Sequence, residues 1–403
     1  MKKVIAYAVC LLFSVMAFPQ VTEKSLVKEG VGFFLGSKGH VKDPHKAFDC
    51  FMEAARLNSA EAKAALGYMY ETGIGAEKDL LKAYEWYLQA ADQDYAGAQY
   101  RLGQMYAKGI GVEMDIEKAL LWYNNALMNG KAEAAVGISA QETIIFQSTK
   151  RLALVIGNEK YSKNKIDYAG TDAKDVTEKL KSLGFDVTVK TNLNLRDMDQ
   201  TIDEFCEKAA DYDVVMFFYI GNAVQVDGVN YLIPVKDKVD PKAIKYDCIN
   251  MERFINKLDY SNANIKIIVL NACRDNSLMG NDPSRKGLAR MTSMGYAIML
   301  SAQAGQTEGD FRQGSNSMFT KMFLDELAEP NIPLYQFLKN VQTRVSRATG
   351  NAQIPSISDD LIDNFYFIYY PQSRIRSLVN DNGPYNDNDI IEELSQMTEN
   401  RTR

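Results

Sequence analysis

The stretch Asp213-Val214-Val215-Met216-Phe217-Phe218-Tyr219-Ile220-Gly221-Asn222-Ala223-Val224-Gln225 decides the fold of the second half of this 403-residue chain. Its apolar run over 214–219 predicts a strand that is buried on both faces, as in a parallel sheet covered by helices. The Gly221-Asn222 pair then predicts a tight loop. Polar residues that directly follow such a strand lie at the carboxyl edge of the sheet, where α/β proteins place their sites.

Strands and helices alternate on both sides of this stretch. The sequence predicts helices at 171–182, 196–210, 248–258, 318–328 and 333–348, and further strands at 152–156, 185–189, 231–235, 265–270, 296–301 and 365–369. The alternation predicts an α/β sandwich with a mostly parallel sheet over 151–370. The strand at 265–270 runs into Asn271-Ala272-Cys273-Arg274, which places Cys273 at the same sheet edge as Asn222.

Several motifs in this half resemble those of bacterial caspase-like cysteine peptidases, the relatives of metacaspases and paracaspases. In chain order they are LALVIGN at 152–158, AGTDA at 169–173, YIGNAVQVDGVNYLIPV at 219–235 and NACRDN at 271–276. A strand-end cysteine about 50 residues after a strand-end histidine is the catalytic layout of that group. The resemblance therefore implies a caspase-like fold and cysteine-peptidase chemistry.

The resemblance also implies a role for individual residues. Cys273 takes the position of the nucleophile, Asn222 that of the histidine base, and the backbone amide of Ala223 that of an oxyanion-hole donor. A pocket that accepts Arg or Lys in the family would be formed by Asp172, Asn271 and Glu308. Competing interpretations stay open: Asp172 as a helix cap together with Thr171, Glu308 as a surface residue of a loop, and Cys273 as an inert buried thiol.

Three of these positions depart from the family pattern. Asn222 replaces the histidine, Ala223 replaces the glycine after it, and Asn271 replaces the acidic residue two before the cysteine. An amide cannot take up or return a proton, so Asn222 cannot act as a general base. Losing one member of a nucleophile–base pair can cost about 10⁶-fold in turnover. The chain's two histidines, His40 and His45, lie far upstream.

The first domain repeats with a period of 36 residues. Leu66-Gly67 recurs as Leu102-Gly103, and Trp86-Tyr87 recurs as Trp122-Tyr123. Cys50-Phe51 occupies the equivalent position of the preceding repeat. Such a period predicts a stack of helix pairs, with Gly residues ending the first helices and Asp79 and Asp115 capping the second ones. The pattern over 28–136 resembles the Sel-one-like repeat, a relative of the tetratricopeptide repeat. It implies a concave surface for a protein partner or, alternatively, a structural spacer.

The ends of the chain carry other signals. Met1-Lys2-Lys3 followed by an apolar run to Phe18 predicts a signal peptide over 1–17, and hence export to the periplasm or beyond the cell. A linker with a possible short helix is expected at 137–150, and a polar tail at 371–403. A net charge of −6 does not indicate binding to nucleic acid. No His or Cys cluster has metal-ligand spacing, and the motifs imply no cofactor.

These observations predict an exported pseudo-peptidase that binds a protein or peptide partner through its helical repeats and the remnant cleft. Two alternatives remain: an active cysteine endopeptidase that cuts after Arg or Lys with a base other than histidine, and an adaptor whose repeats bind the partner while the second domain supports them.

Overall fold

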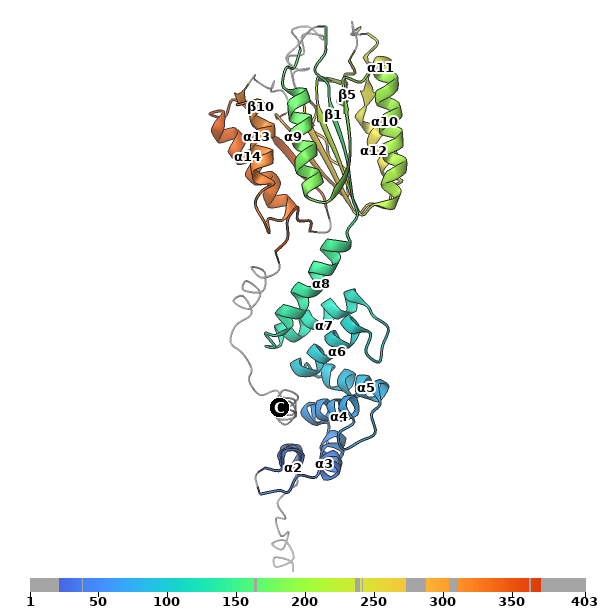
Figure 1. The fold of residues 1–403 in the computed structure, drawn as a ribbon, viewed down its shortest axis with the longest axis vertical. Helices are drawn as coiled ribbons and strands as arrows, with labels where there is room; N and C mark the ends of the chain where they lie inside the picture. Colours follow the sequence, from blue (N-terminus) through green and yellow to red (C-terminus); the bar gives the residue numbers. More distant parts are fainter. Residues whose placement is uncertain are drawn as a thin grey trace, which may run out of the picture. The chain divides into compact units, whose positions relative to one another are not determined.

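The structure, a computed structural model, describes residues 22–37, 39–162, 165–235, 240, 242–272, 288–303, 311–361 and 364–370. Cys273, Glu308, the predicted signal peptide over 1–17 and the predicted tail over 371–403 lie outside these ranges. The chain divides into a helical unit up to Ile144 and a second unit over Ile145–Tyr370 (Figure 1). In the described ranges, no helix combines the length and the hydropathy that crossing a bilayer requires.

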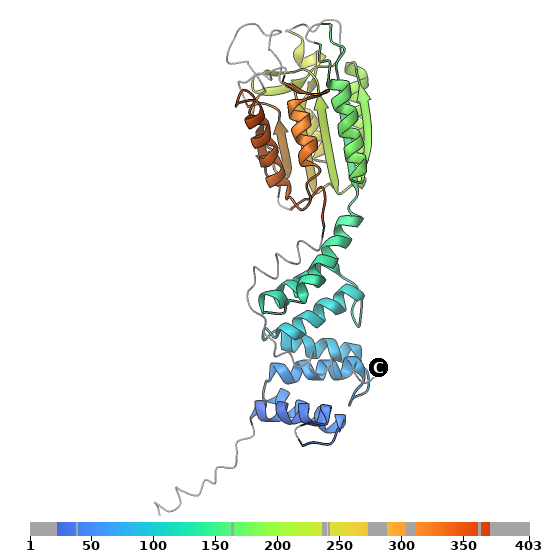
Figure 2. The ribbon, with the colours of Figure 1, turned by 60° about the vertical axis from the view of Figure 1, so that its left-hand side comes forward.

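The helical unit consists of antiparallel helix pairs. Its elements are α2 (Glu23–Leu35), α3 (Pro44–Arg56), α4 (Ala60–Thr72), α5 (Leu80–Ala91), α6 (Ala96–Lys108), α7 (Ile116–Met128) and α8 (Ala134–Ser148). Figure 2 shows the successive pairs stacked on one another. The stretch predicted as a linker with a short helix is instead largely occupied by α8, a continuous helix of 15 residues.

The 36-residue period has a direct packing cause. A Cβ added at Gly67 would lie 2.6 Å from the ring of Tyr87, and one at Gly103 would lie 2.6 Å from the ring of Tyr123. Gly30 meets the ring of Phe51 in the same way. Each first helix thus needs a glycine where the aromatic side chain of its second helix lies against its backbone, because any larger residue would force the two helices apart.

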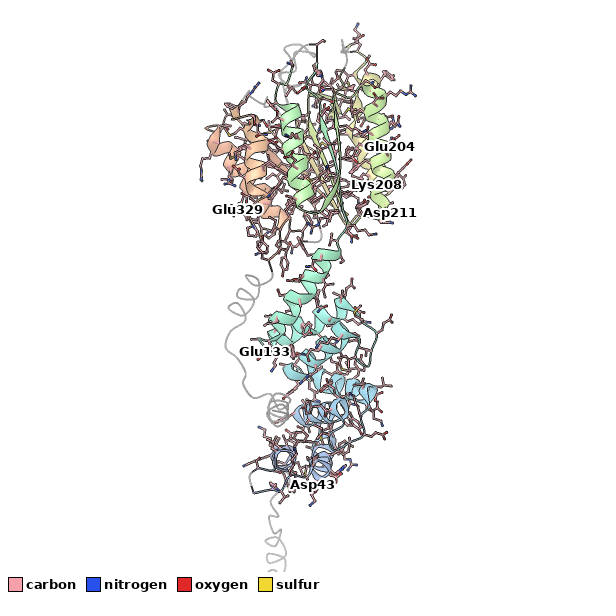
Figure 3. All side chains as sticks on the ribbon, in the orientation of Figure 1. Asp43, Glu133, Glu204, Lys208, Asp211 and Glu329 are labelled. Carbon is pink, nitrogen blue, oxygen red and sulfur yellow. The ribbon has the colours of Figure 1, made fainter. Side chains whose placement is uncertain are left out.

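The predicted helix ends are also observed. Asp43, Asp79 and Asp115 each accept a hydrogen bond from the backbone N–H of a lysine three residues later, at 3.1, 3.0 and 2.9 Å. Asp43 can be located at the start of α3 in Figure 3. Gly73 and Gly109 end α4 and α6 with φ of 77° and 66°, a conformation that glycine adopts without strain.

The second unit is built on a six-stranded sheet in the order β11-β8-β7-β3-β1-β2. All neighbours are parallel except β11 and β8. A smaller antiparallel sheet follows β3, in the order β4-β5-β6. The strands are β1 (Arg151–Gly157), β2 (Phe185–Thr191), β3 (Val214–Ile220), β4 (Ala223–Val226), β5 (Val229–Leu232), β6 (Ile249–Asn250), β7 (Ile265–Asn271), β8 (Tyr296–Leu300), β9 (Arg312–Gln313), β10 (Asn316–Ser317) and β11 (Ser356–Asp359).

Helices cover both faces of the large sheet, as the uninterrupted burial of β3 requires. Figure 1 shows α9, α13 and α14 on one face and α10 and α12 on the other. Their bounds, with those of two shorter elements, are α9 (Ala169–Ser182), α10 (Leu195–Lys208), the 3₁₀ turn η1 (Ala209–Asp211), α11 (Ile244–Asp247), α12 (Met251–Leu258), α13 (Met318–Glu326) and α14 (Leu334–Ala348). The fold is therefore the predicted α/β sandwich preceded by an all-α repeat region.

Three predicted elements need correction. The aromatic run 365–369 is no strand: the last strand of the sheet is the short polar β11, and Tyr366 forms only an isolated bridge with Pro333. The strand expected at 231–235 is β5, which belongs to the small sheet rather than the large one. The helix expected from residue 248 begins at Met251, because Asn250 caps it.

The aromatic run packs instead around a buried cation. The guanidinium of Arg151, a residue only 5% exposed, donates to the backbone carbonyls of Leu183, Phe367 and Phe146 at 3.1, 3.4 and 3.3 Å. It lies 4.1 Å from the ring centroid of Phe146 and 5.4 Å from that of Phe365. Arg151 thus ties the last turn of α8 and the C-terminal segment to the first residue of β1.

Candidate functional site

The carboxyl ends of the central strands bring two of the predicted positions together. Ile220 at the end of β3 pairs with Asn271 at the end of β7, and the N–H of Gly221 donates to the carbonyl of Asn271 at 3.3 Å. Asn222 follows this point by two residues. The turn after β3 and the end of β7 are therefore direct neighbours, as the predicted parallel sheet requires.

Two buried phenols hold the backbone of Asn222. The Asn222 N–H donates to Tyr161 Oη at 3.0 Å, and Tyr219 Oη donates to the Asn222 carbonyl at 2.9 Å. The two phenol oxygens lie 3.2 Å apart, and Tyr161 also donates to the carbonyl of Ile233 at 2.9 Å. These bonds involve only main-chain atoms of residue 222, so they fix the turn whatever side chain it carries.

Neither phenol can act as a general base near neutral pH. Burial raises the pKa of Tyr161 to about 12, and burial together with the nearby Tyr161 raises the pKa of Tyr219 well above its usual value. Both groups therefore stay protonated near neutral pH. A protonated phenol cannot take a proton from a thiol, so these side chains serve as hydrogen-bonding supports for the turn.

Gly221 is required by the same cluster. A Cβ at this position would lie 2.8 Å from Tyr161 Oη and would also clash with the phenol of Tyr219. We expect Gly221→Ala to lower the free energy of unfolding by about 1–3 kcal/mol, the usual cost of overpacking. Chemical denaturation would measure it. Gly170→Ala is the matched control, since its nearest neighbour is the movable carboxylate of Glu159; equal losses in both variants would contradict the explanation.

Ala223 begins β4 and is 6% exposed. The backbone φ of Ala223 is not positive, so this position accommodates a Cβ without strain. The glycine-to-alanine departure therefore leaves the path of the chain after β3 undisturbed. Its expected role as an oxyanion-hole donor remains a prediction.

Asp172 and Asn271 also come together, in a cluster of buried polar side chains joined by hydrogen bonds. Asp172 is 0% exposed and Asn271 is 2% exposed. Asn271 Nδ2 lies 3.4 Å from Asp172 Oδ2, and it donates to Ser317 Oγ at 2.9 Å and Thr320 Oγ1 at 3.1 Å. Asp172 accepts from Ser317 Oγ at 2.6 Å and from Asn316 Nδ2 at 3.0 Å.

The interpretation of Asp172 as the cap of its own helix is wrong. That helix, α9, begins at Ala169, and its N-cap residue Tyr168 makes no side-chain cap bond. Asp172 instead accepts the backbone N–H of Ser317, the N-cap residue of α13, at 3.2 Å. The carboxylate therefore fastens the start of α13 to α9, where the positive end of the helix dipole favours a negative charge.

Burial raises the pKa of Asp172, against the effect of hydrogen bonds from Ser317, Thr320 and Asn316. A folded-state pKa above the unfolded value means that this group favours folding most below the unfolded pKa, and less as pH rises through the folded pKa. Because its donors surround it, Asp172 has no exposed surface with which to attract a cationic ligand.

Sequence reasoning missed four members of this cluster: Asp175, Asn316, Ser317 and Thr320. A Ser before the apolar run that starts at Met318 is an N-cap signature that could have located the start of α13. Nothing in the sequence links that cap to Asp172, 145 positions away. Cys273 and Glu308, the other predicted site residues, lie outside the described ranges. In the described ranges no group of His, Cys, Asp or Glu side chains is arranged to hold a metal ion.

Comparison with known proteins bears on both halves of the chain. A family model described as "Caspase domain" matches residues 150–366, and one described as "Sel1 repeat" matches 30–59, 60–95 and 96–131. A solved structure of a Sel1 repeat protein from Oxalobacter formigenes is 28% identical, with a TM-score of 0.29; the match covers 32% of this chain and 49% of that one. The chain thus spans about half the length of the solved structure that it matches. Among curated proteins, no match was found.

Proposed function

This chain belongs to the caspase-domain family, and from that premise we propose that it is a pseudo-peptidase, a binding scaffold that no longer hydrolyses peptides. The observation that carries the proposal is Asn222 in the turn after β3, at the position where the family resemblance expects the histidine. Both histidines of the chain, His40 and His45, belong to the helical unit. The buried phenols beside Asn222 stay protonated near neutral pH, so they cannot accept a proton.

The rest of the site also departs from the pocket that the family resemblance implies. Asp172 is fully buried among hydrogen-bond donors, and Asn271 supplies an amide where the family pattern has an acid. The amide at Asn271 weakens the attraction of such a pocket for an Arg or Lys side chain, because it removes one negative charge. We propose that the protein is exported, and that the repeats over 28–136 add a second surface for the same partner.

Peptide hydrolysis tests the proposal directly. The mature protein and its Cys273→Ala variant should release fluorophore at the same background rate from peptides ending in Arg, Lys or Asp, with and without calcium. The reason is that a thiol with pKa near 8.5 and no base partner is a poor nucleophile, and its leaving group has no proton donor. Turnover in the unmodified chain that disappears in Cys273→Ala would establish an active endopeptidase instead.

The adaptor alternative makes a different prediction. If the repeats alone bind the partner, a chain that lacks 151–370 retains full affinity for it. If the second domain contributes to the surface, the same deletion weakens binding.

A further inference from the structure

The last helix of the repeat unit, α8, exposes an apolar stripe. Val136 and Ile144 are 57% and 44% exposed, and Ala140 between them is also exposed. These residues are spaced by four, so they lie on one side of the helix. The opposite side is buried, and Ala134 and Ile138 on that side share a hydrophobic cluster with residues of α7. The end of a repeat stack ordinarily presents a polar outer face to solvent, and α8 does not.

The position of α8 in the stack accounts for the exposure of the stripe. At the positions of Val136 and Ala140 in the preceding first helix, α6, the side chains of Tyr100 and Gln104 are half-buried. After α8 the chain runs directly into β1, so no further helix pair follows to cover the stripe. Glu142 is the only charged residue of α8, so an occupant of the stripe must be held by apolar contact rather than by ion pairs.

The C-terminal segment of the same chain starts beside this helix. The ring centroid of Tyr369 lies 6.0 Å from that of Phe146, in the last turn of α8. Val136, at the far end of the stripe, precedes Phe146 by about 15 Å along the helix. The described part of the chain ends at Tyr370, so residues 371–403 begin within one helix length of the whole stripe.

Residues 390–397 of that segment have the sequence pattern of an amphipathic helix. Its apolar residues share one side at helical spacing, and they are Ile390, Ile391, Leu394 and Met397. Asp389 precedes the first turn and Glu392 follows three residues later, as in a capping box. The sequence therefore predicts a short helix whose apolar side has the same spacing as the stripe of α8.

Tethering favours this segment over a second copy of the chain. A flexible chain of the length of 371–389 has a root-mean-square span of about 25 Å, more than the distance from Phe146 to Val136. A short linker of this kind gives its end an effective concentration on the order of millimolar at the stripe. A second copy would have to reach a comparable concentration in solution to compete.

We propose that residues 390–397 pack as a helix on the stripe of α8 and cap the end of the repeat stack. The apolar side of the segment is removed from water in this arrangement, while Glu392 and Glu393 stay on the solvent side. Ala140, the smallest residue of the stripe, leaves room for a large side chain such as Leu394. The proposal goes beyond the pseudo-peptidase assignment: it involves neither Cys273 nor Asn222, so either proposal can fail while the other stands.

Hydrogen exchange measured by mass spectrometry on the mature full chain tests it. Amides of 391–397 should exchange at least about tenfold more slowly than in an unstructured peptide. Leu394→Asn removes an apolar contact from the segment, and Val136→Asp places a charge on the stripe. Each should abolish most of this protection, because burying an amide or a carboxylate without a partner is unfavourable.

Each variant has a matched control. Gln396→Asn introduces the same residue on the polar side of the segment. Leu81→Asp introduces the same charge at another apolar residue in the first turn of a helix, 60% exposed on α5. Both controls should keep the protection. Absence of protection in the unmodified chain, or equal exchange in each variant and its control, would overturn the proposal. A dimer whose dissociation on dilution removes the protection would also overturn it, since the occupant would then come from a second copy.

Discussion

Asn222→His is expected to give the α/β domain Cys273-dependent peptidase activity. A positioned general acid–base group contributes about 10²–10⁴-fold, so turnover should rise at least about a hundredfold above the Cys273→Ala background. The structure favours this result because the turn after β3 is held through its main chain. Tyr161 and Tyr219 bind the N–H and carbonyl of residue 222, and these bonds survive a change of side chain.

The measurement is hydrolysis of fluorogenic peptides ending in Arg, Lys or Asp. Asn222→Gln provides a control that enlarges the side chain without adding a base, and it should stay silent. Adding Cys273→Ala to Asn222→His should abolish the new activity. A properly folded Asn222→His protein, with an unchanged melting temperature and no turnover, would mean that the domain has lost more than its base.

Asn271→Asp, an isosteric change, is expected to destabilise the second unit strongly. It would place a second carboxylate beside Asp172, about where Asn271 Nδ2 now lies 3.4 Å from Asp172 Oδ2. Both positions are buried, at 2% and 0% exposure. Two buried carboxylates cannot both ionise cheaply, so we expect the free energy of unfolding to fall by about 3–5 kcal/mol at pH 8.

The pH dependence identifies the cause. Repulsion and burial raise the folded-state pKa of the carboxylate pair above the unfolded values, so the stabilising contribution of protonation is present at low pH and is lost as pH rises through the folded pKa. The deficit relative to the unmodified protein should therefore shrink from pH 8 to pH 5. Denaturant unfolding at both values would measure this, and a deficit that does not change with pH would contradict the like-charge explanation.

A charge swap provides the matched control. The double variant Asn271→Asp with Asp172→Asn again contains one carboxylate and one amide in the cluster. It should recover a large part of the lost stability, because the two sites are in contact and their effects are not additive. If the double variant instead loses as much stability as the two single variants together, the two side chains do not interact.

Most of the fold could be predicted from the sequence, because its strands are continuous apolar runs and its repeats have a fixed period. The strands 214–219 and 265–270 are near-exact predictions of β3 and β7. The failures occurred where the local pattern competes with tertiary contacts. The aromatic residues 365–369 suggest a strand, but they fill the space around Arg151, whereas β11, which completes the sheet, is the short polar Ser-Ile-Ser-Asp.

The candidate site was predictable only in its position. Parallel strands end at one edge, so Asn222 and Asn271 could be expected to be neighbours. The surroundings of Asp172 could not be predicted, since Asn316 and Ser317 reach it from an element far along the chain. Likewise, the phenol of Tyr219 lies under the turn because Gly221 leaves room for it, a relation that no spacing rule encodes.

The guanidinium of Arg151 has a consequence for how the protein forms during synthesis. It binds the carbonyl of Phe367, 216 residues further along the chain. The helical repeats pair neighbours in sequence and can close as soon as each second helix leaves the ribosome. The α/β unit cannot bury its first strand's cation until its last residues exist, which at about 5–20 residues per second leaves that edge unfinished for tens of seconds. During synthesis the chain therefore carries a folded repeat region attached to an α/β sheet that is still incomplete.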